Sequence, residues 1–149
     1  MIGLIQRVSH AKVVVDEEST GEIGTGILAL IGIQRGDTQD SALRLLDKIL
    51  AYRVFPDTMR RMNLSLADTG GGLLLVPQFT LAADTRKGNR ASFTPAAEPG
   101  YAQALFQFLV SQAQHAHSPV ATGVFGADMK VHLVNDGPVT FWLQTSSGA

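Results

Sequence analysis

The chain has 149 residues, no cysteine and a formal net charge of -1, and this length suits a single domain with its own hydrophobic core. Hydrophobic residues make up 45% of it and charged residues 17%, compared with roughly 25% charged in an average soluble protein, so intrinsic disorder is excluded and the surface is short of charge. A buried subunit interface would explain that shortage, and the lack of cysteine excludes disulfide frameworks, cysteine zinc sites and thiol nucleophiles.

The N-terminal residues predict antiparallel strands. The segment Ile2–Val15 is rich in β-branched and aliphatic side chains, a polar turn follows at Asp16–Thr20, and a second apolar segment runs over Glu22–Ile33. The longest apolar stretch, Ile27–Ile33, is much shorter than the about 18 residues that span a bilayer, and residues 1–15 lack the pattern of a secretion signal. We therefore expect a cytoplasmic protein that does not contact a membrane.

Two later segments have helical periodicity. The first helix is expected to begin at a cap on Asp37 or Thr38 and to end before Pro56. The second is expected to begin at Pro99, because proline is favoured in the first turn of a helix. The positions predicted to face the core are Ala42, Leu45, Leu46, Ile49 and Leu50 in the first helix and Tyr101, Ala104, Leu105, Phe108 and Leu109 in the second.

Further strands are predicted at Gly72–Val76, which ends at Pro77, and at Lys130–Val134 and Val139–Leu143. No repeat, low-complexity tract or linker divides the chain. The order of elements predicts an α/β fold in which a mixed, largely antiparallel sheet packs with two helices, in a single domain over residues 1–149.

A long polar segment, Thr80–Glu98, separates the predicted fourth strand from the second helix. Loops of this length in compact domains are usually functional or disordered. It places Arg86, Lys87 and Arg90 close together among hydroxyl and amide side chains, a set suited to phosphate and ribose oxygens. A solvated surface loop is the alternative, since clusters of basic residues are common on surfaces.

Other motifs carry little weight. Gly24, Gly26 and Ala29 match a dinucleotide-binding fingerprint, but they lead into a predicted strand where that motif needs a helix. His115 and His117 are two positions apart, and such neighbours on a helix do not share a face. We therefore expect no metal site and no cofactor.

Two short segments are more informative: Pro77–Leu81, which reads PQFTL, and Asn135–Thr140, which reads NDGPVT. Together they resemble the paired signatures of the D-aminoacyl-tRNA deacylase (D-tyrosyl-tRNA deacylase) family. The resemblance extends over essentially the whole chain, including the segments Met1–Val8, Thr20–Gly24, Ala82–Thr85 and Ala127–Met129.

The resemblance implies an enzyme that hydrolyses the ester between a D-amino acid and the 3' terminal adenosine of tRNA and releases both. It also implies a homodimer with active sites at the subunit interface. Each site is completed by the Gly137–Pro138 pair of the other chain, and the peptide bond of that pair is cis in the family. A rival function is a non-catalytic, dimeric RNA-binding module that uses the same polar loop.

The implied catalytic residues are Gln78, Phe79 and Thr80. They follow a strand, where backbone N–H groups released from the sheet can stabilise an oxyanion. For Phe79 the alternative is a core aromatic. For Thr80 the alternative is a nucleophile, although no His, Lys or carboxylate lies in a recognisable activating position, so we expect Thr80 to position the substrate while the RNA assists a water. Pro77 stands where the family usually has Ser, and it offers neither an N–H nor a hydroxyl.

Gly137 and Pro138 are implied to reject L-amino acids through a rigid backbone wall that an L side chain would strike. Glycine has no Cβ, so glycyl-tRNA is an expected second substrate. The supporting residues are Arg7, whose guanidinium could bond carbonyls near the Gly–Pro pair, together with Met129 and Asn135. On turn chemistry alone, Asn135–Pro138 equally fits a hairpin turn, and Arg7 equally fits a polar strand face.

Overall fold

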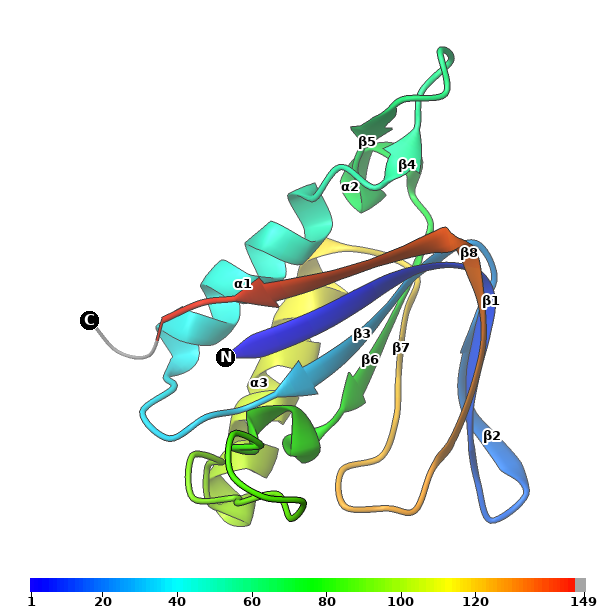
Figure 1. Cartoon of the computed structure of the whole chain (residues 1–149). Coiled ribbons are helices and arrows are strands. Elements are labelled where there is room, and N and C mark those ends of the chain that lie inside the picture. The colour runs from blue at the N-terminus through cyan, green and yellow to red at the C-terminus, as the bar shows by residue number, and fades with distance from the viewer. Residues whose placement is uncertain (147–149) are drawn as a thin grey trace.

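The computed structural model describes residues 1–146 of the chain. Six strands form one mixed sheet (Figure 1), in which β1 pairs antiparallel with β2, β3 and β8, whereas β3, β6 and β7 run parallel. The strands are β1 (Ile2–Val15), β2 (Glu18–Ile23), β3 (Gly26–Gly32), β6 (Gly72–Pro77), β7 (Val120–Thr122) and β8 (Lys130–Gln144). The predicted single α/β domain with a mixed sheet is confirmed.

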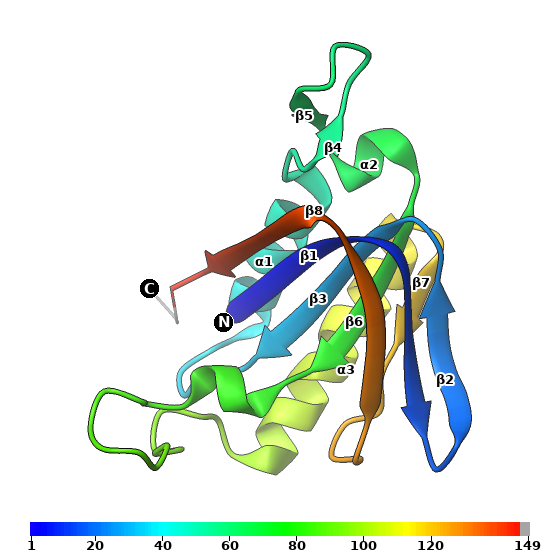
Figure 2. The same ribbon diagram turned by 45° about the vertical axis from the view of Figure 1, so that its right-hand side comes forward.

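A bend in β1 shapes the molecule. Its first half, Ile2–Val8, pairs with β3, and its second half, Ala11–Val15, pairs with β2. β8 pairs with β1 along both halves. The sheet therefore curls over on itself, as Figure 2 shows for β1, β2 and β8. Within the described chain, β1 is the only strand that pairs with β8.

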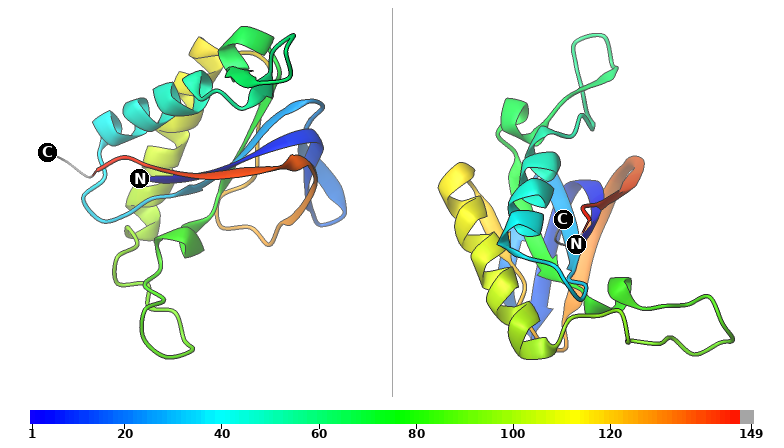
Figure 3. Two further views of the ribbon diagram at one scale, coloured as in Figure 1. Left: turned by 45° about the horizontal axis from the view of Figure 1, so that its top comes forward. Right: turned by 90° about the vertical axis from the view of Figure 1, so that its left-hand side faces the viewer.

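The helices are α1 (Gln39–Ala51), α2 (Leu66–Thr69), the 3-10 helix η1 (Phe79–Ala82) and α3 (Pro99–Ala116). The two long helices, α1 and α3, lie together on one face of the sheet (Figure 3). The short helices α2 and η1 add to the two helices predicted. A separate hairpin, made of β4 (Phe55–Pro56) and β5 (Met62–Leu64), projects beyond the end of α1 (Figure 1). No helix within residues 1–146 is long and apolar enough to span a bilayer.

Alternating side chains of β3 contribute to two cores. Ile27, Ala29 and Ile31 belong to the larger cluster with α1 and α3, whereas Leu28 joins Val13 in a smaller cluster under the curled-over strands. A strand buried on both faces has a continuous apolar sequence, and this explains the long apolar stretch noted in this part of the chain.

The helix α1 begins at one of its two predicted caps. The hydroxyl of Thr38 accepts a hydrogen bond from the Ser41 N–H, and the Ser41 hydroxyl accepts one from the Thr38 N–H, which together form a capping box. The predicted core positions are confirmed, because the first four are buried and the last is half-buried: Ala42, Leu45, Leu46, Ile49 and Leu50.

The face predicted to be buried in α3 is partly wrong. Leu105 and Leu109 are buried, but Tyr101 and Ala104 are exposed and Phe108 is half-buried. The buried residues of the helix are Ala102, Leu105, Phe106, Leu109, Val110 and Ala113. Because α3 carries apolar side chains on more than one side, periodicity alone does not choose between neighbouring faces.

Two strand boundaries near the N-terminus differ from the prediction. The segment Glu22–Ile33 is interrupted at Gly24 and Thr25, so it contributes to both β2 and β3. The preceding turn is narrower than predicted and consists of Asp16 and Glu17, whose φ angles are 48° and 67°. Two residues with positive φ are the backbone pattern of a tight hairpin.

The C-terminal pair of strands is in fact one strand. Lys130–Val134 and Val139–Leu143 both lie in β8, and both pair antiparallel with β1. The hairpin turn considered at Asn135–Pro138 is therefore wrong, because the chain does not reverse its direction there. Gly and Pro at this point interrupt the pairing of a continuous strand.

Candidate functional site

The signature turn, Pro77–Leu81, carries the chain from β6 into η1. The N–H of Gln78 donates to the Ile31 carbonyl at 2.7 Å, and the N–H of Leu81 donates to the Gln78 carbonyl at 3.2 Å. Between them, the N–H groups of Phe79 and Thr80 have no acceptor among residues 1–146. The candidate oxyanion donors are thus reduced from three to two, because β3 already accepts the hydrogen bond of Gln78.

The side chain of Thr80 is exposed and is held from within the same turn. Its hydroxyl pairs with the side-chain amide of Gln78. In the part of the chain that the structure describes, no His, Lys or carboxylate bonds to this hydroxyl. A nucleophilic Thr needs a base to remove its proton, so the arrangement supports a positioning role.

The side chain of Phe79 points away from the core. It is 58% exposed and packs against Phe93, with ring centroids 5.1 Å apart. The core-aromatic alternative for Phe79 is therefore wrong. The two rings form an exposed aromatic surface beside the free N–H groups.

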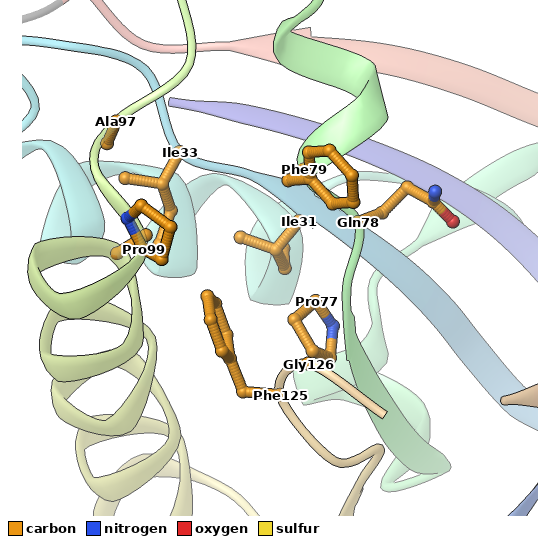
Figure 4. A pocket seen from close by; sticks show the side chains of 10 residues that line it. Ile31, Ile33, Pro77, Gln78, Phe79, Ala97, Pro99, Phe125 and Gly126 are labelled. Atoms are coloured by element: carbon orange, nitrogen blue, oxygen red, sulfur yellow. The ribbon is translucent and has the colours of Figure 1, made fainter. Parts of the chain in front are cut away.

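An apolar pocket of about 230 Å³ opens beside the signature turn (Figure 4). Pro77 and Phe79 lie on one side of it, Pro99 and Phe125 lie on the other, and Ile31 lies between them. The remaining lining residues are Ile33, Gln78, Ala97, Ala102 and Gly126. Most of this set is not marked in the sequence, because four separate segments contribute to it and no local pattern links them.

The basic loop, residues 83–98, leaves η1 and returns to α3. Backbone hydrogen bonds between Asp84 and Ser92 close its outer part. Arg86 donates to both carboxylate oxygens of Asp84 at 2.9 Å, and these hydrogen bonds lower the pKa of that carboxyl to about 2. The charge of Arg86 is therefore offset, whereas neither Lys87 nor Arg90 has an ion-pair partner within residues 1–146.

The Gly–Pro bulge, Asp136–Val139, interrupts β8. In the pairing with β1, Gln6 lies opposite Thr140 and Val8 lies opposite Asn135. An advance of two residues along β1 therefore corresponds to five residues along β8. The Gly137–Pro138 peptide bond is cis, as the resemblance implies. Gly137 has a φ of 146°, and a Cβ placed there would lie 2.6 Å from Cγ2 of Val139, so only glycine fits without movement.

Side chains hold the bulge in place. Arg7, whose side chain is 13% exposed, donates from Nε to the Asp136 carbonyl at 3.0 Å and from Nη1 to the Val54 carbonyl at 2.6 Å. Asn135 donates from Nδ2 to Oγ1 of Thr140 at 2.8 Å, and its Oδ1 accepts the Val139 N–H at 2.8 Å. The surface alternative for Arg7 is therefore wrong, and the predicted support of the Gly–Pro pair has a structural basis.

One chain does not bring the bulge and the signature turn together. Gln78 bonds to Ile31, whereas Arg7, which holds the bulge, pairs with Ile27. These two positions on β3 are about 13 Å apart along the strand, and β6 and β8 are separated by about 14 Å across β3 and β1. The two signatures therefore lie at different ends of the sheet.

Met129 lies near the first residue of the signature turn. Its Sδ accepts the Val124 N–H at 3.4 Å. A Cβ added to Gly123 would be 2.8 Å from this Sδ and 3.5 Å from Cδ of Pro77. Met129 therefore lies beside Pro77 and packs against the smaller core cluster, and it does not line the pocket.

No cluster of three or more His, Asp or Glu side chains in residues 1–146 is arranged to hold a metal ion. The two neighbouring histidines are engaged elsewhere. A ring nitrogen of His115 lies 2.7 Å from the Ser111 carbonyl, and one of His117 lies 2.6 Å from the Gly71 carbonyl.

Comparison with known proteins gives consistent matches over the full chain. A family model described as D-Tyr-tRNA(Tyr) deacylase matches residues 4–144. A protein of Thioalkalivibrio sulfidiphilus named D-aminoacyl-tRNA deacylase is 72% identical over 144 residues, covering 97% of each chain. One of the same name from a Janthinobacterium species is 62% identical over 144 residues, again covering 97% of each. A solved structure titled c-Myc DNA Unwinding Element Binding Protein superimposes with a TM-score of 0.94 and 37% identity, covering 99% of this chain and 100% of that one.

Proposed function

The chain belongs to the D-Tyr-tRNA(Tyr) deacylase family, and on that premise we propose how it hydrolyses D-aminoacyl-tRNA to a free D-amino acid and tRNA. The observation that carries the proposal is the pair of free N–H groups, of Phe79 and Thr80, beside the apolar pocket. A non-catalytic RNA-binding module is not favoured, because relatives this similar carry the name of the enzyme. We infer a cytoplasmic location, where charged tRNA is used.

The pocket takes the terminal adenine of the tRNA. Its lining is apolar and includes the rings of Phe79 and Phe125, and stacking of a base on an aromatic side chain contributes about 1–3 kcal/mol. Phe79, in the helix η1 that precedes the basic loop, and Ala97, near the end of that loop, line the same pocket. Lys87 and Arg90 are thereby available to the phosphates that precede the terminal adenosine.

Hydrolysis proceeds at the signature turn. Water attacks the ester carbonyl, and the N–H groups of Phe79 and Thr80 donate to the oxygen as it gains negative charge. The bond to the ribose oxygen then breaks, that oxygen takes up a proton, and the amino acid leaves as a carboxylate. The neighbouring ribose hydroxyl accepts one proton of the water while it passes its own proton to the departing oxygen, and the second proton goes to solvent as the carboxylic acid ionises. No side-chain base bonds to Thr80 in the described chain.

The Gly–Pro bulge of a second copy completes the site, so the functional unit is a homodimer. Three features support this assembly. The bulge lies far from the signature turn of its own chain, β8 presents an outer edge that lacks a strand partner in residues 1–146, and the same strand exposes Val134 and Trp142 by 57% and 53%. Exposed apolar side chains on an unpaired strand are typical of a surface that is covered in the assembled protein.

Selection for D-amino acids follows from the rigidity of the bulge. Its backbone is held by Arg7 and Asn135, so it does not yield to an L side chain directed at it. A wall made of backbone atoms does not contact a D side chain that points away from it. Such a wall suits an enzyme that accepts many D-amino acids. Glycine carries no side chain to collide, and we expect glycyl-tRNA to be cleaved as well.

The proposed function is tested with purified protein and with D-tyrosyl-tRNA and L-tyrosyl-tRNA as matched substrates. Release of tyrosine from the D ester, with the L ester left intact, is the expected result. Binding of both esters without release of tyrosine from either would refute the enzyme and favour the RNA-binding module.

The homodimer is tested by sedimentation at micromolar protein concentration. A species of about twice the chain mass is expected from the symmetric assembly that a shared site requires. A protein that hydrolyses the D ester and yet sediments only as a monomer of 15.9 kDa would contradict the shared site.

A further inference from the structure

The proposed reaction gives no role to the β4–β5 hairpin, residues 55–64. It extends away from the sheet and from both long helices (Figure 3). Its tip, residues 57–61, is held by Asp57, whose carboxylate accepts the N–H groups of Met59 at 2.8 Å and Arg61 at 3.0 Å. The hydrogen bonds from the Arg61 N–H and the Asn63 side chain lower the pKa of the Asp57 carboxyl.

The tip presents positive charge to solvent. Arg60 and Arg61 are adjacent and exposed, and neither has an ion-pair partner in the described chain. The one nearby carboxylate, of Asp57, is occupied by backbone N–H groups and by Nδ2 of Asn63 at 2.8 Å. Two unpaired guanidinium groups on a preformed tip are suited to phosphate oxygens, which they can bind without first breaking an internal ion pair.

The hairpin is tied to the Gly–Pro bulge by a single side chain. Arg7 donates to the carbonyl of Val54, which immediately precedes β4, and also to the carbonyl of Asp136 in the bulge. Arg7 therefore holds the base of the hairpin next to the bulge. From Val54, the chain up to Arg60 can extend at most about 20 Å.

We propose that Arg60 and Arg61 bind backbone phosphates of the tRNA whose aminoacyl end is held in the partner subunit's site. This inference rests on the proposed function, because it needs the bulge to enter the partner's site. When the bulge lies against the aminoacyl group, the hairpin lies beside that site and directs its basic tip along the RNA. Each tRNA is thus bound by the basic loop of one subunit and the hairpin of the other.

The test compares a long and a short substrate. The long substrate is D-tyrosyl-tRNA, and the short one is the D-tyrosyl ester of a CCA trinucleotide, which lacks the acceptor helix. For the Arg60→Asn/Arg61→Gln variant, the ratio of kcat/KM on the long substrate to that on the short one is expected to fall about tenfold, through KM. The slope of log kcat/KM against log salt on tRNA is expected to become shallower by about 2. Asn is chosen at position 60 because the φ there is 62°, which Asn tolerates.

Two variants serve as controls. Lys12→Gln/Lys130→Gln removes the same charge from the far ends of β1 and β8 and is expected to leave the ratio unchanged. Arg60→Lys/Arg61→Lys keeps both charges and is expected to retain most of the ratio. Equal melting temperatures establish that each variant is folded.

The outcomes separate this inference from the proposed function. An unaltered ratio and salt slope in the folded Arg60→Asn/Arg61→Gln variant would overturn the hairpin contact and leave the enzyme intact. An equal fall in the Lys12→Gln/Lys130→Gln control would also overturn it, because net charge alone would then account for the effect. Wild-type protein that cleaves neither substrate would overturn the proposed function itself.

Discussion

The signature turn and the Gly–Pro bulge use their backbone polar groups in opposite ways. At the turn, the N–H groups of Phe79 and Thr80 have no acceptor in the described chain, and the nearby side chains are exposed. At the bulge, two backbone groups are held by side chains: the Asp136 carbonyl accepts from Arg7, and the Val139 N–H donates to Asn135. The first region has backbone donors that are available to a ligand, and the second has a backbone that is already held.

In the proposed shared site, this contrast joins reactivity with selectivity. Free N–H groups contribute to catalysis because the charge that develops in the transition state satisfies them. A rejecting wall contributes only if it does not yield, and breaking one of the hydrogen bonds that hold it costs about 0.5–1.5 kcal/mol. A single loop cannot have both free N–H groups and a fully held backbone. In this protein the two features lie at different ends of the sheet.

The largest expected effect comes from removing one free N–H from the turn. Phe79→Pro deletes the backbone donor at the first position of η1, where proline is tolerated. We expect kcat on D-tyrosyl-tRNA to fall by about 100- to 1,000-fold relative to Phe79→Ala, which loses the ring and keeps the donor. Single-turnover kinetics of the two variants measure the difference. Equal rates would show that the N–H does not take part.

Replacing Thr80 sharpens the account of the turn. If the backbone and the ribose hydroxyl perform the chemistry, Thr80→Ala should lower kcat by about 10- to 100-fold, the scale of one lost positioning contact. A tRNA with a terminal 2'-deoxyribose should be affected more than this. Mass spectrometry of the quenched reaction checks for an acylated Thr80. Finding that adduct, or full activity on the deoxy substrate with an inactive Thr80→Ala enzyme, would assign the chemistry to the hydroxyl.

Loosening the bulge should change selectivity more than rate. In Gly137→Ala the new Cβ meets Val139 and the φ of 146° becomes strained, so the backbone must move. We expect the preference for D- over L-tyrosyl-tRNA to fall by about 10-fold, a value typical of one changed steric contact. Both esters are followed under the same conditions. A folded Gly137→Ala protein that still rejects the L ester completely would contradict a rigid wall.

The smallest effects are expected in the basic loop. There Arg86 forms an ion pair with Asp84, whereas neither Lys87 nor Arg90 has an ion-pair partner within residues 1–146. Lys87→Gln/Arg90→Gln should raise KM for D-tyrosyl-tRNA by about 3- to 10-fold and make its salt dependence shallower. Arg86→Gln is the matched control, and its effect should be smaller because Asp84 already offsets that charge. A larger effect of Arg86→Gln would mean that the Asp84 pair opens when tRNA binds.

Local sequence patterns predicted the elements but not their connections at the site. The cap on α1 and the strand β1 follow from residue type and periodicity, which are local properties. The single strand β8 was missed because Gly137 and Pro138 have turn chemistry, and only pairing with β1 on both sides shows that the chain continues. The packing face of α3 was also left undetermined, because its apolar side chains lie on more than one side of the helix and only tertiary packing selects between them.

The sequence predicted the candidate site as two signatures. The fold adds the residues that surround the signature turn. Gln78 was expected to supply a donor, but the neighbouring strand β3 already accepts its hydrogen bond. Phe125 and Ala97 reach the pocket from segments that no motif marks. Such proximity depends on tertiary packing, so a single sequence does not contain it in readable form.

The shared site is tested most directly by mixing two defective chains. Phe79→Pro chains carry an impaired turn and an intact bulge, and Gly137→Ala chains carry the reverse. Differently tagged chains are refolded together, the mixed dimer is isolated, and its kcat is measured on D- and L-tyrosyl-tRNA. If the bulge acts across the interface, the mixed dimer contains one fully intact site and hydrolyses the D ester with wild-type selectivity. A mixed dimer with the relaxed selectivity of the Gly137→Ala homodimer would show that each chain uses its own bulge, and the central claim would be wrong.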